Sequence, residues 1–133
     1  MKLTPYLVFN GQAEEALHFY ADMLGGRIEN LHRYDSLPDT PEEYKQKILH
    51  ACLLFDNGSL SAADTLPHEK ADFGKLGYMM TLEFDSMAKI EHVYAKLSDG
   101  AREIRCALGE TFFAKRYAEV YDRFGVLWAL VFE

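Results

Sequence analysis

Cysteine is scarce in this sequence: the chain has two, Cys52 and Cys106, and neither belongs to a Cys-x-x-Cys pair. Two cysteines are too few for a disulfide framework, and we expect each to be a small buried hydrophobe rather than a nucleophile. Long apolar runs are also missing, so no segment is expected to span a bilayer. The apolar stretch near the N-terminus stops at Asn10 and Gly11, which is too short for a signal peptide. We therefore expect a cytoplasmic protein with no membrane partner.

Positive charge is in deficit. Lys and Arg total 14 against 21 Asp and Glu, which gives a net charge of −7. Binding to nucleic acid depends on clustered Lys and Arg. The densest basic spots here are Lys115 with Arg116 and Lys45 with Lys47, and both have acidic neighbours. The sequence therefore argues against nucleic acid as a partner.

What the sequence does contain is an ordinary globular balance and an internal repeat. Its 133 residues are 49% hydrophobic and 26% charged, which suits a single domain, 1–133, with a real core. The segments HFYADMLGG (18–26) and HVYAKLSDG (92–100) resemble each other, and each ends a helical pattern at glycine. The repeat indicates two related halves.

Both halves carry apolar residues at helical spacing. The expected stripes are Ala13, Ala16, Leu17, Tyr20, Ala21 and Leu24 in the first helix and Met87, Ile90, Val93, Tyr94 and Leu97 in the second. The residues able to cap or end these helices are, in chain order, Asn10 or Gly11, Gly25 or Gly26, Asp85 or Ser86, and Gly100.

Strand-like runs flank both predicted helices. They cover 4–9, 26–34 and 48–64 in the first half and 77–84, 101–108 and 116–132 in the second. The two long runs contain turn signals, Asp56-Asn57-Gly58 and Asp122-Arg123-Phe124-Gly125, so each forms a hairpin. This pattern predicts an α+β fold of two βαβββ modules. Module one covers about 1–65, a linker about 66–75, and module two about 76–133.

One face of each small sheet is expected to pack on its helix, and the other face needs a different cover because its strands are apolar on both sides. A curved mixed sheet with a cleft would satisfy this need, and small-molecule sites favour such concave places. Aromatic residues make up 14% of the chain. A second copy is therefore expected to bury apolar surface, since a monomer that exposed it would aggregate.

This layout resembles the vicinal oxygen chelate superfamily (glyoxalase/bleomycin resistance protein/dioxygenase), and in particular its PhnB-like branch. The resemblance covers nearly the whole chain and rests on PYLVFNGQAEEALHFY, LGGRI, RYDSLP, KILHACLLFDNGSL and ETFFAKRYAEVYDRFGVLWAL. It implies the βαβββ fold, a homodimer and a small-molecule ligand. Members of the branch are often labelled demethylubiquinone methyltransferases, yet no Gly-rich cofactor loop follows a strand here, and the chain is short for such an enzyme.

The resemblance also implies where a metal would bind. In metal-dependent members, four ligands, usually His, Gln or Glu, project from inward-facing strand positions, two in each half. The matching positions here are Pro5 or Tyr6, Ala63 or Asp64, Met79 give or take one residue, and Ala129. Of these, Asp64 alone could ligate in the usual way, and one carboxylate does not hold a metal at neutral pH. We therefore expect no cofactor, and a divalent metal only if the strand register is misread.

Eight residues are candidates for ligand binding, and no catalytic residue is assigned: Tyr34, His50, Asp64, Glu110, Phe112, Arg116, Tyr117 and Trp128. Trp128 is either a stacking surface for a flat ligand or a core residue. His50 either forms core hydrogen bonds or serves a site, and the PhnB-like branch has a histidine at the matching position. Asp64 either binds ligand at the cleft mouth or caps the following loop. Glu110 acts as an acid or base if it is buried, and otherwise lies in a surface turn.

The other candidates are also ambiguous. Arg116 and Tyr117 point to opposite faces of one strand, and Arg116 is either a bidentate contact for an anionic ligand or a solvated salt-bridge partner. Phe112 opens the second hairpin beside Glu110 and either lines the cleft or covers the barrel end. Tyr34 precedes a long loop and could rim the cleft.

Three functions remain compatible with these residues. The first is a non-catalytic binder of a small apolar or aromatic molecule, as in bleomycin resistance. The second is a metal-dependent lyase, isomerase or transferase. The third is a metal-free enzyme in which His50, Asp64 or Glu110 is the base. We rank the binder first and the metal-free enzyme next; the sequence does not specify the ligand.

Overall fold

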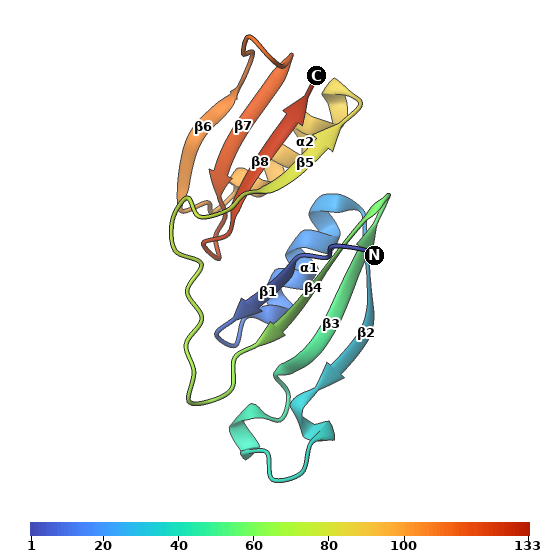
Figure 1. Cartoon of the computed structure of the whole chain (residues 1–133), viewed down its shortest axis with the longest axis vertical. Coiled ribbons are helices and arrows are strands. Elements are labelled where there is room, and N and C mark those ends of the chain that lie inside the picture. The colour runs from blue at the N-terminus through green and yellow to red at the C-terminus, as the bar shows by residue number, and fades with distance from the viewer. The chain divides into compact units, whose positions relative to one another are not determined.

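The computed structural model describes all residues 1–133, and it divides into two compact units, Met1–Asp72 and Phe73–Glu133 (Figure 1). The division lies inside the predicted linker, 66–75. Each unit contains one α-helix and one four-stranded sheet. Neither helix has the length and hydrophobicity that crossing a membrane would require.

The first unit has the element order strand, helix, three strands. The elements are β1 (Tyr6–Phe9), α1 (Ala13–Leu24), β2 (Arg27–Arg33), β3 (Ile48–Phe55) and β4 (Gly58–Asp64), with 3-10 turns at Tyr34–Ser36 and Glu42–Tyr44 between β2 and β3. The strand order across the sheet is β1-β4-β3-β2. β1 runs parallel to β4, and the other neighbours are antiparallel.

The second unit repeats this arrangement with β5 (Met80–Phe84), α2 (Met87–Ser98), β6 (Glu103–Gly109), β7 (Arg116–Tyr121) and β8 (Leu127–Phe132). Its strand order is β5-β8-β7-β6, again with the parallel pair at one side. The predicted α+β class with two βαβββ modules is therefore confirmed. Both predicted hairpin turns are present, with Asp56 at φ 38° and Gly125 at φ 91°.

The helix ends show one correction. α2 is capped as expected by Ser86, whose hydroxyl accepts a hydrogen bond from the Lys89 amide at 3.1 Å. α1 ends at Gly25, which has φ 69° and lies in the left-handed region as predicted. Its start, however, is capped by neither Asn10 nor Gly11, because the Ala13 amide donates to Asp64 Oδ1 at 2.9 Å. The cap comes from the end of β4, which local sequence reasoning could not anticipate.

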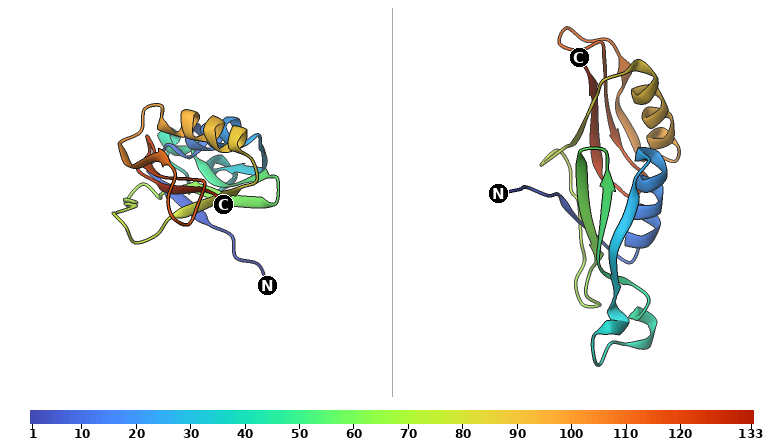
Figure 2. Two further views of the ribbon diagram at one scale, coloured as in Figure 1. Left: turned by 90° about the horizontal axis from the view of Figure 1, so that it is seen from above. Right: turned by 90° about the vertical axis from the view of Figure 1, so that its right-hand side faces the viewer.

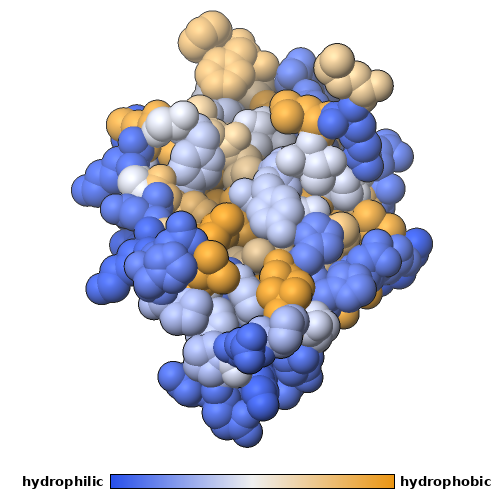
Figure 3. Space-filling view, turned by 60° about the horizontal axis from the view of Figure 1, so that its bottom comes forward, coloured by the Kyte–Doolittle hydropathy of each residue, from blue (hydrophilic) through white to orange (hydrophobic).

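Each helix packs on one face of its own sheet (Figure 2). In the first unit Ala16, Leu17 and Tyr20 of α1 are fully buried, as are Leu53 and Ala62 of the sheet. In the second unit the buried helix residues are Ile90, Val93 and Leu97. Apolar residues on the surface drawn in Figure 3 lie in patches among polar ones. Because side chains alternate along a strand, each sheet also has a second face without a helix, which we call its open face.

Candidate functional site

The open face of the first sheet follows from the strand register. Asp64 contacts the start of α1, so Ala62 and Leu60, at alternate positions of β4, also face the helix. The intervening positions and their cross-strand partners must face the other way. The open face therefore carries Tyr6 and Val8 of β1, Ser61 and Ala63 of β4, His50, Cys52 and Leu54 of β3, and Glu29 of β2.

Four polar side chains of this face form a connected row. The Tyr6 hydroxyl lies 2.8 Å from His50 Nδ1, and the two rings are 5.6 Å apart at 33°. On the other side of the imidazole, Nε2 lies 3.6 Å from Cys52 Sγ. The thiol in turn lies 3.5 Å from the Ser61 hydroxyl. The row thus joins β1, β3 and β4, and it brings Tyr6 to His50 across 44 residues of sequence.

The electrostatics of the row keep the phenol protonated. Burial raises the pKa of the Tyr6 hydroxyl above its ordinary value, and negative charge on Cys52 acts in the same direction. A neutral hydroxyl can donate or accept a hydrogen bond, so it is compatible with either tautomer of His50. The tautomer with hydrogen on Nδ1 donates to Tyr6 and leaves the Nε2 lone pair directed at the thiol.

Apolar side chains flank the row and leave it accessible. Tyr6 is 49% exposed and Val8 is 37% exposed, and His50 and Cys52 are both half-buried. Val8 lies beside Ala63 across the β1–β4 pair, and Leu54 continues the face beyond Cys52. The arrangement offers a flat molecule both apolar contact and fixed hydrogen-bonding groups.

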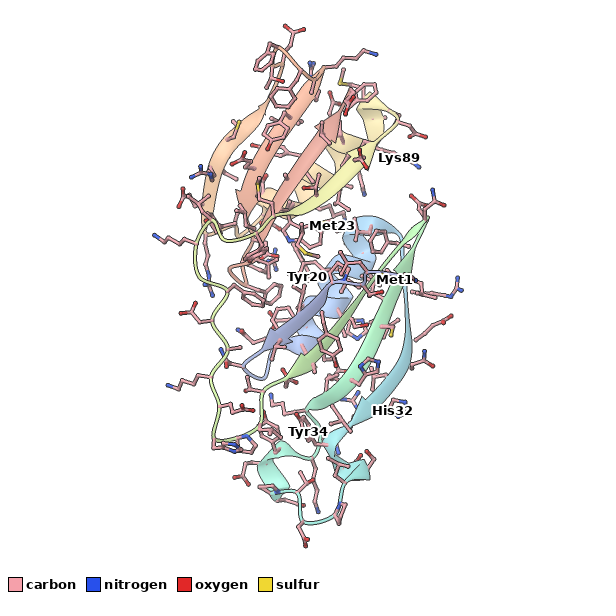
Figure 4. All side chains as sticks on the ribbon, in the orientation of Figure 1. Met1, Tyr20, Met23, His32, Tyr34 and Lys89 are labelled. Atoms are coloured by element: carbon pink, nitrogen blue, oxygen red, sulfur yellow. The ribbon has the colours of Figure 1, made fainter.

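Two other candidates in the first unit, Tyr34 and Asp64, come together away from this face. Asp64 is 2% exposed, and its second carboxylate oxygen accepts from the Ile48 amide at 2.9 Å. The Tyr34 hydroxyl donates to the Asp64 carbonyl at 2.9 Å, and its ring packs edge-on against Tyr44. Figure 4 shows Tyr34 where β2 ends. Asp64 therefore lies on the helix side rather than at a cleft mouth, because the register of β4 sets its direction.

The second sheet has its own polar group on the open face. The Tyr117 hydroxyl donates to Glu119 Oε2 at 2.7 Å, and Arg105 Nε donates to Glu119 Oε1 at 2.7 Å. Burial and then the hydrogen bond to Glu119 raise the pKa of Tyr117 to about 12. Alternation along β7 puts Tyr117 and Glu119 on one face, but Glu119 and Arg105 were not among the candidates of the sequence analysis. The bulged register of β6 conceals the Arg105 contact.

Glu110 and Phe112 lie in the connection between β6 and β7. Glu110 is exposed, so the burial that would make it an acid or base is absent, and the surface-turn interpretation is correct. Phe112 is 100% exposed, and its ring packs edge-on against Phe113 at 5.2 Å. Phe113 packs in the same way on Tyr117 at 5.1 Å. These aromatic rings thus extend from the open face into the loop.

Arg116 and Trp128 belong to the helix-facing register of the second sheet. Arg116 pairs with Phe132, and its guanidinium donates to the Lys115 carbonyl at 2.8 Å. Trp128 is 1% exposed and pairs with the fully buried Val120. The structure therefore supports the core alternative for Trp128 and corrects its proposal as a stacking surface. Side chains alternate along β8, so Ala129 faces the open side and Trp128 faces the helix.

The sequence analysis overlooked Tyr6, Cys52 and Ser61 as members of a binding row. It considered Tyr6 as a possible metal position and treated Cys52 as a buried hydrophobe. The spacing of His50 and Cys52 in one strand already places them on one face. Their partner Tyr6 comes from β1, 44 residues away from His50, and no local sequence pattern indicates this pairing.

At the positions where the resemblance implies metal ligands, the open faces carry few groups that bind a divalent ion. The open-face positions of β1 and β4 supply phenol, hydroxyl and methyl groups from Tyr6, Ser61 and Ala63. In the second sheet, the open-face partner of Ala129 is Thr81 of β5, two residues beyond the predicted Met79. None of these is an imidazole or carboxylate, which such ions require. The chain also brings no three His, Cys, Asp or Glu side chains together in a group that could hold a metal.

Comparisons place the chain among known proteins. A family model described as 3-demethylubiquinone-9 3-methyltransferase matches residues 1–131. The crystal structure of protein PA1353 from Pseudomonas aeruginosa is 34% identical, with a TM-score of 0.89 over 100% of this chain and 98% of that one. A putative 3-demethylubiquinone-9 3-methyltransferase, PhnB protein, from Bacillus cereus is 24% identical, with a TM-score of 0.82 over 100% of both chains.

A more distant structure shows the wider fold. The glyoxylase/bleomycin resistance protein/dioxygenase domain from Frankia sp. EAN1pec is 14% identical, with a TM-score of 0.71 over 99% of this chain and 96% of that one. Such low identity establishes a shared fold and leaves the chemistry to the residues themselves.

Proposed function

The chain belongs to the family described as 3-demethylubiquinone-9 3-methyltransferase, the PhnB-like branch of the glyoxalase/bleomycin resistance/dioxygenase superfamily, and from this premise we propose that it binds a small organic molecule without a metal. The ligand has a flat apolar body and one hydrogen-bonding group. It lies on the open face of the first sheet, over Tyr6 and His50.

The observation that carries this proposal is the half-exposed hydrogen-bonded row Tyr6–His50–Cys52. Polar groups that are oriented before the ligand arrives lose little freedom on binding, which favours affinity. Val8 and Leu54 supply apolar surface beside them. A few placed polar groups on a mainly apolar surface are the usual composition of small-molecule sites.

Methyl transfer, which the family's description names, is not the function we propose. The two strand-to-helix connections, 10–12 and 85–86, contain no Gly-rich loop that could cradle a nucleotide-like cofactor. In the first connection the Asn10 side chain is engaged at both ends of its amide, with the Ala71 amide and carbonyl. These bonds fasten the linker, 66–75, to the segment that precedes α1.

We extend the proposal to a cytoplasmic homodimer. Two free cysteines and no disulfide suit a reducing compartment. The exposed rings of Phe112 and Phe113 suit burial by a second copy.

The proposal is tested by ligand screening followed by matched variants. Flat aromatic compounds are screened by calorimetry, and binding is located from the NMR resonances of Val8 and the His50 ring. His50→Ala is expected to weaken the best ligand about five-fold, the loss of roughly 1 kcal/mol for one hydrogen bond. His92→Ala, on the exposed side of α2, is the control. Equal affinity in both variants, or shifts confined to other residues, would reject this site.

The proposal that the ligand binds without a metal has a separate test. The untagged protein is dialysed against Zn, Ni, Mn and Fe(II), freed of excess ions and analysed by mass spectrometry. We expect no stoichiometric metal. Retention of about one ion per chain would refute this part and would move the metal-dependent enzymes from last place to first.

A further inference from the structure

We propose that Cys52 is a nucleophilic thiol activated by His50, and that it forms covalent adducts with α,β-unsaturated carbonyl compounds. The proposal rests on the proposed function in one respect, since the electrophile must reach the same open face. It replaces our expectation that Cys52 is an inert buried hydrophobe.

The geometry is that of a nucleophile, a base and a group that orients the base. Cys52 Sγ lies 3.6 Å from His50 Nε2, and His50 Nδ1 lies 2.8 Å from the Tyr6 hydroxyl. A nucleophile beside a base that is itself held by a third group is the recurring signature of covalent catalysis. Tyr6 acts through His50 and is therefore a positioning residue.

The thiol can ionise without leaving an unpaired charge. When Nδ1–H donates to the Tyr6 oxygen, the Nε2 lone pair can accept the Cys52 proton. The resulting imidazolium then stands beside the thiolate, and a thiolate beside a protonated histidine is stabilised. The Ser61 hydroxyl, 3.5 Å from Sγ, supplies a second donor. The thiolate therefore has a partner on each side.

The charged groups facing the pair come from β2. Glu29 is the cross-strand partner of Cys52, and its carboxylate is paired with Arg27 at 2.6 Å, which reduces its repulsion of a thiolate. His32 lies opposite His50 and is exposed. The neighbouring strand β4 contributes no charge here, since its facing residues are Ser61 and Ala63.

The reaction balances with no oxidant or leaving group. Sulfur forms a bond to the β-carbon of the unsaturated carbonyl, and the carbon–carbon π pair moves to the α-carbon and carbonyl oxygen. The proton that His50 took from the thiol returns to the α-carbon. The product is a thioether, and His50 ends in its starting state. A disulfide within the first unit is excluded, because that unit contains no second cysteine.

The flatness of a conjugated carbonyl also suits the surface. Val8 and Leu54 flank the row on the open face, with Tyr6 exposed beside them. When the Tyr6 oxygen accepts from Nδ1–H, its own hydrogen is left to donate to the ligand's carbonyl, where negative charge develops during addition.

The test measures alkylation by acrylamide, an unsaturated amide that reacts by the same addition. Rates at Cys52 and Cys106 are followed in the same intact protein by peptide mass mapping, between about pH 5.5 and 9.5. Cys106 is the internal control, because it is also half-exposed but has the Ala107 carbonyl rather than an imidazole as its contact. Rates in urea-unfolded protein correct for local sequence.

We expect Cys52 to react about ten-fold faster than Cys106 near pH 7. The alkylation rate of both cysteines increases with pH, and for Cys52 this increase should begin at a lower pH than for Cys106. His50→Gln should remove this advantage, Tyr6→Phe should shift the pH profile upward, and His92→Gln should change neither. Equal corrected rates in the wild type overturn the proposal, whether or not the variants fold. An advantage that survives in His50→Gln also overturns it.

Calorimetry of the wild type separates this proposal from the binding proposal. If the wild type binds a screened flat compound while its alkylation is not accelerated, the covalent chemistry alone is rejected. If wild-type alkylation is accelerated but no flat compound binds, the non-covalent proposal alone is rejected.

Discussion

The indole Nε1 of Trp128 donates a 2.9 Å hydrogen bond to Oδ2 of Asp122, and both side chains are buried. The other carboxylate oxygen of Asp122 accepts from the Phe124 amide at 2.8 Å and the Val126 amide at 3.0 Å. One carboxylate thus fixes the turn between β7 and β8 and anchors the tryptophan of β8. The apolar strand after this turn, β8, is packed in the core of the second unit.

Replacing Asp122 should therefore destabilise the second unit. In Asp122→Asn the amide oxygen can still accept hydrogen bonds from the backbone amides of the turn. Its NH2 group, however, faces the indole N–H of Trp128, so two hydrogen-bond donors oppose each other in the core. We expect a loss of about 2 kcal/mol of unfolding free energy, measured by urea denaturation. Asp99→Asn is the control, because the Asp99 side chain is 83% exposed. A loss no larger than that of the control would contradict the anchoring role.

Asp64 should behave in the same way in the first unit, although it was a ligand candidate. Asp64→Asn leaves its NH2 group opposite either the Ala13 or the Ile48 amide, both of which now donate to the carboxylate. We expect a loss of about 1–3 kcal/mol in urea denaturation. Asp35→Asn, on an exposed turn, is the control.

The same variant separates the structural role of Asp64 from a binding role. Because Asp64 lies on the helix side, the affinity of folded Asp64→Asn for a screened ligand should equal that of the wild type. A lower affinity with unchanged stability would show that Asp64 contacts the ligand.

These two carboxylates show what sequence patterns could and could not settle. Periodicity and turn signals predicted the order of the elements, the hairpins and most of the buried stripe of α1, in which Met23 is buried and the predicted Ala21 and Leu24 are only partly so. They did not reveal that Asp64 caps α1, because that bond joins residues 51 positions apart. Likewise, the register of β8 decides which face of the sheet Trp128 points to. A shift of one residue in this register would have turned Trp128 to the open face.

The candidate site was predictable only in part, for the same physical reason. Alternation along β3 put His50 and Cys52 on one face, and the PhnB-like resemblance drew attention to His50. The contacts that organise them come from β1 and β4, and pairing between distant strands is not encoded in any local pattern. For Glu110 the sequence left both burial and a surface turn open, and in the structure its carboxylate and the neighbouring phenylalanines lie exposed in the loop.

The proposed homodimer gives a prediction for the exposed loop between β6 and β7. We expect the wild type to elute at twice the chain mass by light scattering, and the double variant Phe112→Ser with Phe113→Ser to elute as a monomer. Exposed aromatic rings contribute much of the binding energy when a partner buries them. Leu37→Ser, at an apolar residue that is 44% exposed in another loop, is the control. A monomeric wild type, or a double variant that remains dimeric, would exclude this loop as the interface.

Tyr117 provides a prediction for alkaline pH. Its pKa of about 12 in the folded protein exceeds the ordinary value of 10, chiefly through burial and the bond to Glu119. Between these two values the unfolded chain has lost the phenol proton and the folded chain has kept it. The stabilisation is therefore complete below about pH 10 and is lost as pH rises toward 12. Tyr117→Phe should lower stability at pH 8 and flatten the decline of the urea midpoint from pH 10 to 12. If the urea midpoint of the variant declines as steeply as that of the wild type across this pH window, other tyrosines cause the loss of stability at alkaline pH. The Tyr117–Glu119 bond would then not be its cause.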